Sequence, residues 1–145
     1  MANGTLVKFG FPDSLIRCYE HWCVLLRPAQ VTLGSLVLGS TGEATSFSQI
    51  PPQAFAELAT VSRHIEEGLK AFRSYDKINY LMLMMVDPHV HFHVIPRYAE
   101  ARRFADVEFA DSGWPGQPNL AGAMTLSPDM QNRLRDEVRR HWPKD

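Results

Sequence analysis

The chain has 145 residues, of which 15 are Lys or Arg and 16 are Asp or Glu, so its formal net charge is −1. This balance leaves no surplus of positive charge for a nucleic-acid backbone, which argues against a DNA- or RNA-binding protein. The 45% hydrophobic content is that of an ordinary globular protein, and the longest apolar run, residues 81–86, is too short to cross a bilayer. We therefore expect a single domain over residues 1–145 that makes no membrane contact.

The first half of the chain predicts two strands and one long helix. Residues 21–26 and 35–38 are rich in aromatic and branched side chains, and Pro and Gly lie between these two segments. A helix is expected to begin near Pro51 and to end at residues 73–75. Its apolar residues recur at helical spacing, at Phe55, Leu58, Ile65, Leu69 and Phe72.

The two cysteines, Cys18 and Cys23, are five residues apart and form no CxxC pair. Within one strand they would point to opposite faces, so we expect no disulfide between them. The first ten residues also lack the pattern of a secretory leader. A reducing, cytoplasmic location is the simplest interpretation.

The second half predicts a pair of strands followed by a loop and a helix. Residues 78–86 and 89–95 are apolar enough for strands, and the short Asp87-Pro88 link between them favours antiparallel pairing. We expect Pro96 to end the second strand and residues 98–123 to be irregular. A last helix is expected from Ser127. The predicted class is α+β, with an antiparallel sheet and helices packed against it.

Three histidines alternate in the last predicted strand, at His89, His91 and His93. In a strand they would share one face at intervals of roughly 6.6 Å. The opposite face would then pack on the core through Val90, Phe92 and Val94. Imidazole is a good nucleophile at phosphorus when a neighbouring group fixes its tautomer, and a second imidazole can donate hydrogen bonds to phosphate oxygens.

The segment His89-Val90-His91-Phe92-His93-Val94-Ile95, followed by Pro96-Arg97-Tyr98, resembles the signature of the histidine triad superfamily. The resemblance covers residues 20–98 as the family core and leaves residues 99–145 as a variable C-terminal loop and helix. It implies a homodimer and a nucleotide hydrolase or transferase that needs no metal or other cofactor. The implied substrates are nucleoside phosphoramidates, dinucleoside polyphosphates and adenylylated compounds, which react at the α-phosphate.

The same resemblance implies a role for each histidine. His91 would attack phosphorus and form a nucleotidyl-histidine, the backbone carbonyl of His89 would orient its ring, and the side chain of His93 would contact the phosphate. Three further residues are candidates for substrate binding: Asn79, Ser35 and Arg97. Ser35 stands where the family commonly has another histidine, and its hydroxyl could bond His89.

Two other positions depart from the family pattern. Residues 25–27, which end the first strand, hold Arg27 but no Asn or Asp for ribose hydroxyls. Asp87, just before the triad, would repel a phosphate where many members have Gln or Ser. These departures keep open a second hypothesis, a nucleotide-binding module with little turnover.

A third hypothesis is a metal site that uses two of the triad histidines with Asp87 or His21. Outside the triad, Trp114 and Trp142 could stack on a base, although packing at a dimer contact is the better interpretation. His64 and His141 are expected to be surface residues.

Overall fold

The structure, a computed structural model, describes residues 2–145. Its helices are α1 (Gly4–Lys8), α2 (Pro52–Phe72) and α3 (Pro128–Arg140), with short 3-10 turns η1 (Phe47–Gln49) and η2 (Leu120–Gly122). Its strands are β1 (Leu15–Cys18), β2 (Trp22–Leu26), β3 (Ala29–Gln30), β4 (Leu36–Ser40), β5 (Lys77–Leu81), β6 (His91–Arg97), β7 (Arg102–Phe104), β8 (Val107–Phe109) and β9 (Met124–Thr125).

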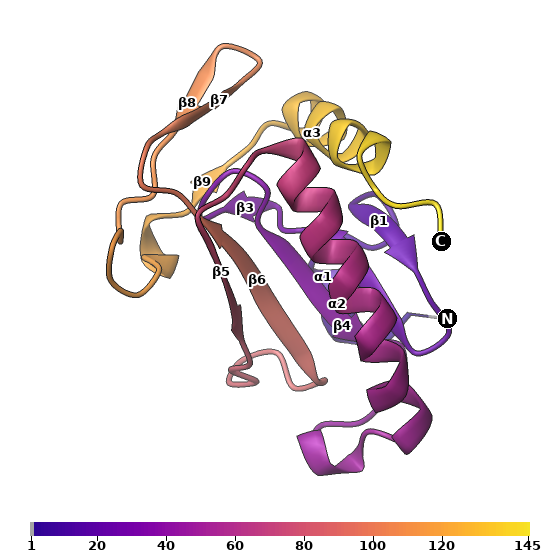
Figure 1. The fold of residues 1–145 in the computed structure, drawn as a ribbon. Helices are drawn as coiled ribbons and strands as arrows, with labels where there is room; N and C mark the ends of the chain where they lie inside the picture. Colours follow the sequence, from indigo (N-terminus) through magenta and orange to yellow (C-terminus); the bar gives the residue numbers. More distant parts are fainter. Residues whose placement is uncertain (1) are drawn as a thin grey trace.

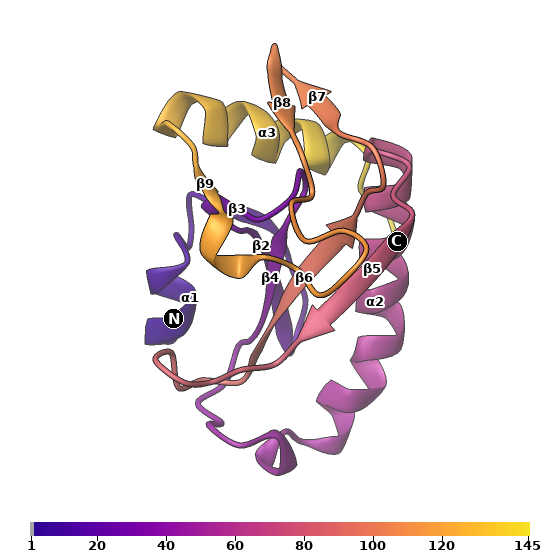
Figure 2. The ribbon, with the colours of Figure 1, turned by 90° about the vertical axis from the view of Figure 1, so that its left-hand side faces the viewer.

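The centre of the fold is a five-stranded antiparallel sheet in the order β1-β2-β4-β6-β5. The long helix α2 lies across one face of this sheet, and α3 packs beside it near β1 (Figure 1). The short helix α1 lies on the opposite side of the sheet from α2 (Figure 2). The predicted α+β class is therefore confirmed. No helix within residues 2–145 combines the length and apolar character needed to cross a membrane.

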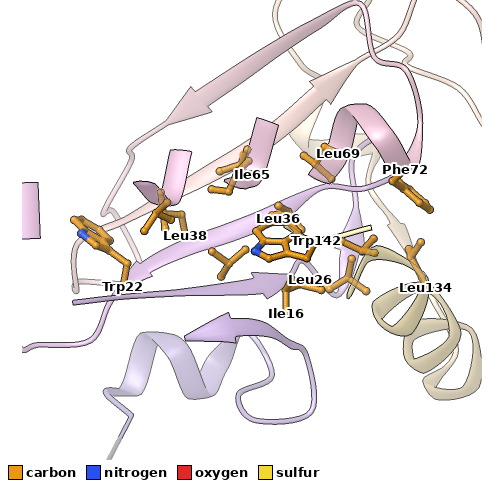
Figure 3. Close-up of a cluster of buried hydrophobic side chains, with 14 of the residues drawn as sticks. Ile16, Trp22, Leu26, Leu36, Leu38, Ile65, Leu69, Phe72, Leu134 and Trp142 are labelled. Carbon is orange, nitrogen blue, oxygen red and sulfur yellow. The ribbon is translucent and has the colours of Figure 1, made fainter. Parts of the chain in front are cut away.

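The main core lies between α2 and the sheet (Figure 3). The buried stripe of α2 includes Ile65 and Leu69, which pack against a sheet face that carries Leu36 and Leu38. Trp142 closes the end of this core and is only 8% exposed, so it packs within its own chain and not at a dimer contact. Its indole comes so close to α2 that a Cβ added at Gly68 would lie 2.8 Å from the ring.

His64 is buried in α2 and not at the surface, which corrects the prediction for this residue. Its Nδ1 accepts a hydrogen bond from the Tyr19 hydroxyl at 2.8 Å, and that hydroxyl accepts one from Trp142 Nε1 at 3.0 Å. Helical periodicity misplaced His64 because Tyr19 and Trp142 cover a side of α2 that the stripe of apolar residues does not mark. By contrast, α3 begins as predicted, with the Ser127 side chain accepting from the Met130 N–H.

The strand predicted at residues 78–86 ends early. β5 stops at Leu81, and residues 82–90 form a long connection to β6 in place of a two-residue turn. The pairing of β5 with β6 ends at the pair Leu81–His93, two residues inside the first residue of β6, His91. The apolar sequence of residues 78–86 gives no sign that the strand ends at Leu81. Met85 and Val86 continue the apolar run but are 87% and 81% exposed.

Two further predictions in this region need correction. Pro96 does not end β6, because its carbonyl accepts from Thr32 on the side where β4 has not yet begun, and a missing N–H there removes no ladder bond. Residues 98–123 are not wholly irregular, because β7 and β8 form a hairpin within them.

The two cysteines form a disulfide, contrary to the prediction. The chain reverses direction at residues 19–21, so Cys18 on β1 and Cys23 on β2 are direct cross-strand partners. The prediction treated the segment as one strand and missed this reversal. The argument for a reducing location that rested on unpaired cysteines therefore falls.

Candidate active site

β6 carries its histidines on the sheet face that looks away from α2. Alternation places His91 and His93 on this face, while Val94 points into the core beneath α2. The helix α1 covers the same face, where its Leu6 packs so closely that a Cβ added at Gly39 would lie 2.5 Å from it. The two imidazoles therefore lie between a rigid strand and a short N-terminal helix.

His91 has a defined tautomer. Its Nδ1–H donates to the backbone carbonyl of His89 at 2.7 Å, so the proton sits on Nδ1 and the lone pair on Nε2 is free to attack. The residue is 2% exposed, which means that solvent reaches this nitrogen poorly in the present conformation. A ring held in this way has the tautomer that nucleophilic attack by an imidazole requires.

His93 lies beside His91, with ring centroids 5.1 Å apart and the rings nearly perpendicular. Its Nδ1 accepts a hydrogen bond from Arg27 Nε at 3.3 Å, so its own proton sits on Nε2 and can be donated. Burial, the Arg27 charge and His91 together lower the pKa of His93 from 6.5 to about 4. A neutral imidazole with a fixed N–H donor suits an electrophilic role beside the nucleophile.

His89 does not belong to β6, so the expected row of three imidazoles on one strand face is not formed. The Thr5 hydroxyl hydrogen-bonds His89 Nδ1 at 2.9 Å and also accepts from the His89 backbone N–H at 3.2 Å. On the other side of the ring, His89 Nε2 lies 3.0 Å from a Glu43 carboxylate oxygen. These contacts fix the position of the His89 carbonyl that orients His91.

The sequence motif gave no indication that α1 belongs to the site. Thr5 binds His89, and the Phe9 ring packs against His91 and His93 at centroid distances of 5.7 and 5.6 Å. Lys8 Nζ lies 2.7 Å from Asp87, so this carboxylate is paired with a cation and does not face a phosphate alone. The helical segment after the capping residue Asn3 is the one feature of the sequence that could have suggested this element.

Two of the hollows on this side of the sheet lie at the triad or along the strand beside it. One of about 180 Å³ lies at the triad, lined by residues 83–87 with His91 and His93. A larger one of about 780 Å³ runs along β5 and is walled by residues 114–118 of the opposite loop. Leu81 lines this larger hollow and is the cross-strand partner of His93, so the hollow begins next to the histidines.

The three candidate substrate-binding residues do not meet at the triad. Asn79 and Arg97 line the larger hollow, where Arg97 Nη1 donates to Asn79 Oδ1 at 2.8 Å. Arg97 is 4% exposed and forms a two-pronged salt bridge with the carboxylate of Asp111, at 2.7 and 3.0 Å. Ser35 is fully buried in a turn and bonds Thr32, not His89.

Trp114 also lines the larger hollow, whereas His141 caps the C-terminal end of α3 next to Glu137. No three His, Cys, Asp or Glu side chains of residues 2–145 gather in a group that could hold a metal ion.

Comparisons with known proteins agree with this architecture. The family model of the HIT domain matches residues 23–100. A histidine triad protein from Bradyrhizobium japonicum has a TM-score of 0.73 at 18% identity, with 99% of this chain and 98% of that chain covered. A hypothetical histidine triad nucleotide-binding protein from Sulfolobus tokodaii has a TM-score of 0.65 at 17% identity, with coverages of 88% and 82%.

A Zn-bound histidine triad family protein from Mycobacterium smegmatis has a TM-score of 0.59 at 19% identity, with 93% of this chain and 90% of that chain covered. Among curated proteins, no sequence matches. Identities this low establish only the shared fold, but the family model spans more than half of the chain and includes all three triad histidines. The chain belongs to the histidine triad (HIT) domain family.

Proposed function

We propose that this protein is a nucleotide hydrolase or transferase that acts at the α-phosphate of a nucleotide conjugate through a nucleotidyl-histidine at His91. The hydrogen bond from His91 Nδ1 to the carbonyl of His89 carries this proposal, because it leaves Nε2 unprotonated. The nucleotide-binding name of the Sulfolobus tokodaii relative is in keeping with such a substrate. Phosphoramidates and dinucleoside polyphosphates are the candidate conjugates.

In the first step, His91 Nε2 attacks the α-phosphorus and an N–P bond forms. The leaving group departs with the electron pair of its bond to phosphorus and takes a proton from water. His93 Nε2–H donates to a non-bridging phosphate oxygen as negative charge builds up there. The His91 ring becomes cationic in the adduct, and its Nδ1–H bond to His89 stabilises that charge.

In the second step, water attacks the same phosphorus and the N–P bond breaks. The nucleotide leaves, the proton of the attacking water passes to solvent, and His91 returns to its neutral form. An alcohol, amine or phosphate in place of water would give transfer instead of hydrolysis. No step requires a metal or another cofactor.

Substrate entry requires movement of α1. The hollow of about 180 Å³ at the triad is smaller than the roughly 300 Å³ at which ordinary ligand pockets begin. Opening toward the hollow along β5 would supply the missing space and bring Asn79 within reach of the substrate. Arg97 and Ser35 then act indirectly, since their polar groups are taken by Asp111 and Thr32.

The test is intact-mass analysis after incubation with an adenosine phosphoramidate or diadenosine tetraphosphate. The wild-type protein should gain the mass of one AMP moiety transiently and release AMP. His91→Gln keeps a side chain of similar size and should show neither effect, and His141→Ala should behave as wild type. Equal turnover by His91→Gln and wild type would overturn the proposal.

The binding-module hypothesis keeps one supporting observation, the 2% exposure of His91. It predicts saturable nucleotide binding in both wild type and His91→Gln, with no adduct in either. A metal-dependent protein would instead lose activity or stability with a chelator, so the assays are run with and without one.

The proposal includes a homodimer and a cytoplasmic location. Among residues 2–145, β5 has a sheet neighbour on one side only, so a second copy could extend the sheet there. Light scattering of the purified protein gives the oligomeric state. Alkylation of cell lysates under acid quench reports whether Cys18 and Cys23 are bridged in the cell, and a fully bridged pair would oppose a cytoplasmic location.

A further inference from the structure

Arg27 is a cation at the triad that no carboxylate of the described residues neutralises. It follows the last residue of β2, and its backbone N–H continues the ladder to the Ser35 carbonyl at 2.9 Å. Its side chain turns toward the histidines, where Nε donates to His93 Nδ1 at 3.3 Å and Nη1 donates to the Ala29 carbonyl at 2.5 Å. Within residues 2–145, no Asp or Glu oxygen lies in salt-bridge distance of this guanidinium.

The absence of a counter-ion is costly because Arg27 is partly buried. Burial lowers the pKa of Arg27, which means that the environment opposes its charge. The comparable cation on the same sheet face, Arg97, has the carboxylate of Asp111 against it. A charged arginine that is half-buried and has no carboxylate partner can bind an anion from outside the chain.

Arg27 borders its own hollow of about 190 Å³, which Lys8, Phe9, Pro28 and Ala29 also line. The hollow therefore contains two cationic side chains. Arg27 Nη2 makes no hydrogen bond to any residue of the described chain, so it is free to donate into this space. The volume suits a phosphate group and not a nucleoside.

We propose that Arg27 and Lys8 form a subsite for a second phosphate of the substrate, beside the phosphate that reacts at His91. The inference rests on the proposed function, and it makes Arg27 the residue that selects substrates with more than one phosphate. The second phosphate competes with Asp87 for Lys8, because Lys8 Nζ lies 2.7 Å from that carboxylate in the free protein. Arg27 Nη2 offers the phosphate oxygens a charge-assisted donor, while Nε and Nη1 hold the guanidinium in place through His93 and Ala29.

The second phosphate can belong to either end of the substrate. In a dinucleoside polyphosphate it is part of the leaving group, and in a ribose-phosphorylated nucleotide it belongs to the group transferred to His91. Both arrangements present the same chemistry to Arg27. A substrate with a neutral amine leaving group and free ribose hydroxyls presents no such group.

The test compares kcat/KM of wild type and Arg27→Gln on three substrates: adenosine phosphoramidate, its 3′-phosphorylated analogue, and diadenosine tetraphosphate. Charge-assisted hydrogen bonds are worth about 1.5–3 kcal/mol, so the loss should be about 10- to 100-fold greater for whichever substrate places its second phosphate at Arg27. Which of the two doubly charged substrates shows the greater loss identifies the source of that phosphate. The exposed Arg63→Gln is the control and should leave all three values unchanged.

Arg27 also positions His93, and that role alone would reduce all three kcat/KM values by the same factor. Equal losses therefore overturn the subsite. Arg27→Lys keeps the charge without the fork and should retain part of the preference, provided that its melting temperature matches that of wild type.

A direct binding measurement separates this inference from the proposed function. If wild type turns over none of the substrates, calorimetry with inorganic pyrophosphate still tests the subsite. Binding that is at least tenfold weaker in Arg27→Gln supports the subsite on a binding protein. Equal binding by the two proteins, or no binding to wild type, overturns it.

Discussion

The backbone carbonyl of His89, and not its side chain, orients the ring of His91, through a hydrogen bond of 2.7 Å to Nδ1. The His89 ring points elsewhere, toward Thr5 of α1 and toward Glu43. The first histidine of the motif therefore contributes its main chain to the orientation of the His91 ring and its side chain to the docking of α1. The two contributions can be separated by mutation.

His89→Ala should retain most of the activity because alanine supplies the same carbonyl. We expect kcat to stay within about tenfold of wild type, and the lost contacts to Thr5 and Glu43 to reduce the free energy of unfolding by about 1 kcal/mol. Steady-state kinetics and urea unfolding measure the two effects. A loss of activity as severe as that of His91→Gln would mean that the His89 imidazole itself takes part in the chemistry.

The salt bridge between Lys8 and Asp87 connects the end of α1 to the loop before the triad. Lys8→Met should open the site more often, because it removes this connection above His91. An exposed pair is worth about 0.2–1 kcal/mol, so modification of His91 by diethyl pyrocarbonate should become about two- to fivefold faster, with little change in global stability. Peptide mass mapping follows the reaction at His91.

Lys8→Arg is the matched control for this experiment, since it preserves the ion pair and should react at the wild-type rate. Accelerated modification of His141 as well would indicate general loosening. An unchanged rate at His91 in Lys8→Met would show that α1 does not limit access.

The low pKa of His93 makes stability depend on pH in a defined window. Burial, with Arg27 and His91 nearby, lowers this pKa to about 4, whereas the unfolded chain takes up the proton near pH 6.5. Between these values the unfolded state binds more protons, so the free energy of unfolding falls as the pH falls, by about 3 kcal/mol in total. Above pH 6.5 His93 is neutral in both states and no longer changes the free energy of unfolding with pH.

His93→Gln should lose this part of the pH dependence. Urea unfolding of both proteins between pH 4 and pH 7 provides the measurement, and the difference between the two curves removes the contribution of the other titrating groups. Parallel curves would mean that His93 titrates normally in the folded state.

The sequence predicted the elements that follow a regular period and missed those that depend on long-range contacts. The alternation through β6 correctly separated Val94 from His91 and His93, and apolar spacing located α2. The run at residues 78–86 misled because methionines in an exposed connection look the same as methionines in a strand. Nothing local marks Leu81 as the last residue that pairs with β6.

The candidate site shows the same division between features that follow from the local sequence and features that depend on distant parts of the chain. Alternation predicted that His91 and His93 share one face, and the resemblance to the histidine triad superfamily implied the contact between the His91 ring and the His89 carbonyl, which is present at 2.7 Å. The contributions of Thr5, Phe9 and Arg27 could not be predicted, since each reaches the triad from a distant part of the chain. A helix of five residues such as α1 is too short to leave a periodic signal.

The salt bridge between Arg97 and Asp111 holds the wall of the larger hollow onto β6. The two side chains are 4% and 1% exposed, and Asp111 also accepts hydrogen bonds from the backbone N–H groups of Tyr98 and Gly113. Asp111→Ala would leave the Arg97 charge buried without a partner. We expect the free energy of unfolding to fall by about 3–5 kcal/mol.

Urea unfolding checks this expectation, with the exposed Asp13→Ala as the control, which should stay within about 0.5 kcal/mol of wild type. Asp111→Asn separates charge from shape, because the amide oxygen can still accept from Arg97 while the opposite charge is gone. A small effect of Asp111→Ala would mean that Arg97 reaches water once its partner is removed. In that case the loop at residues 114–118 does not depend on the ion pair, and the hollow along β5 is held open by packing alone.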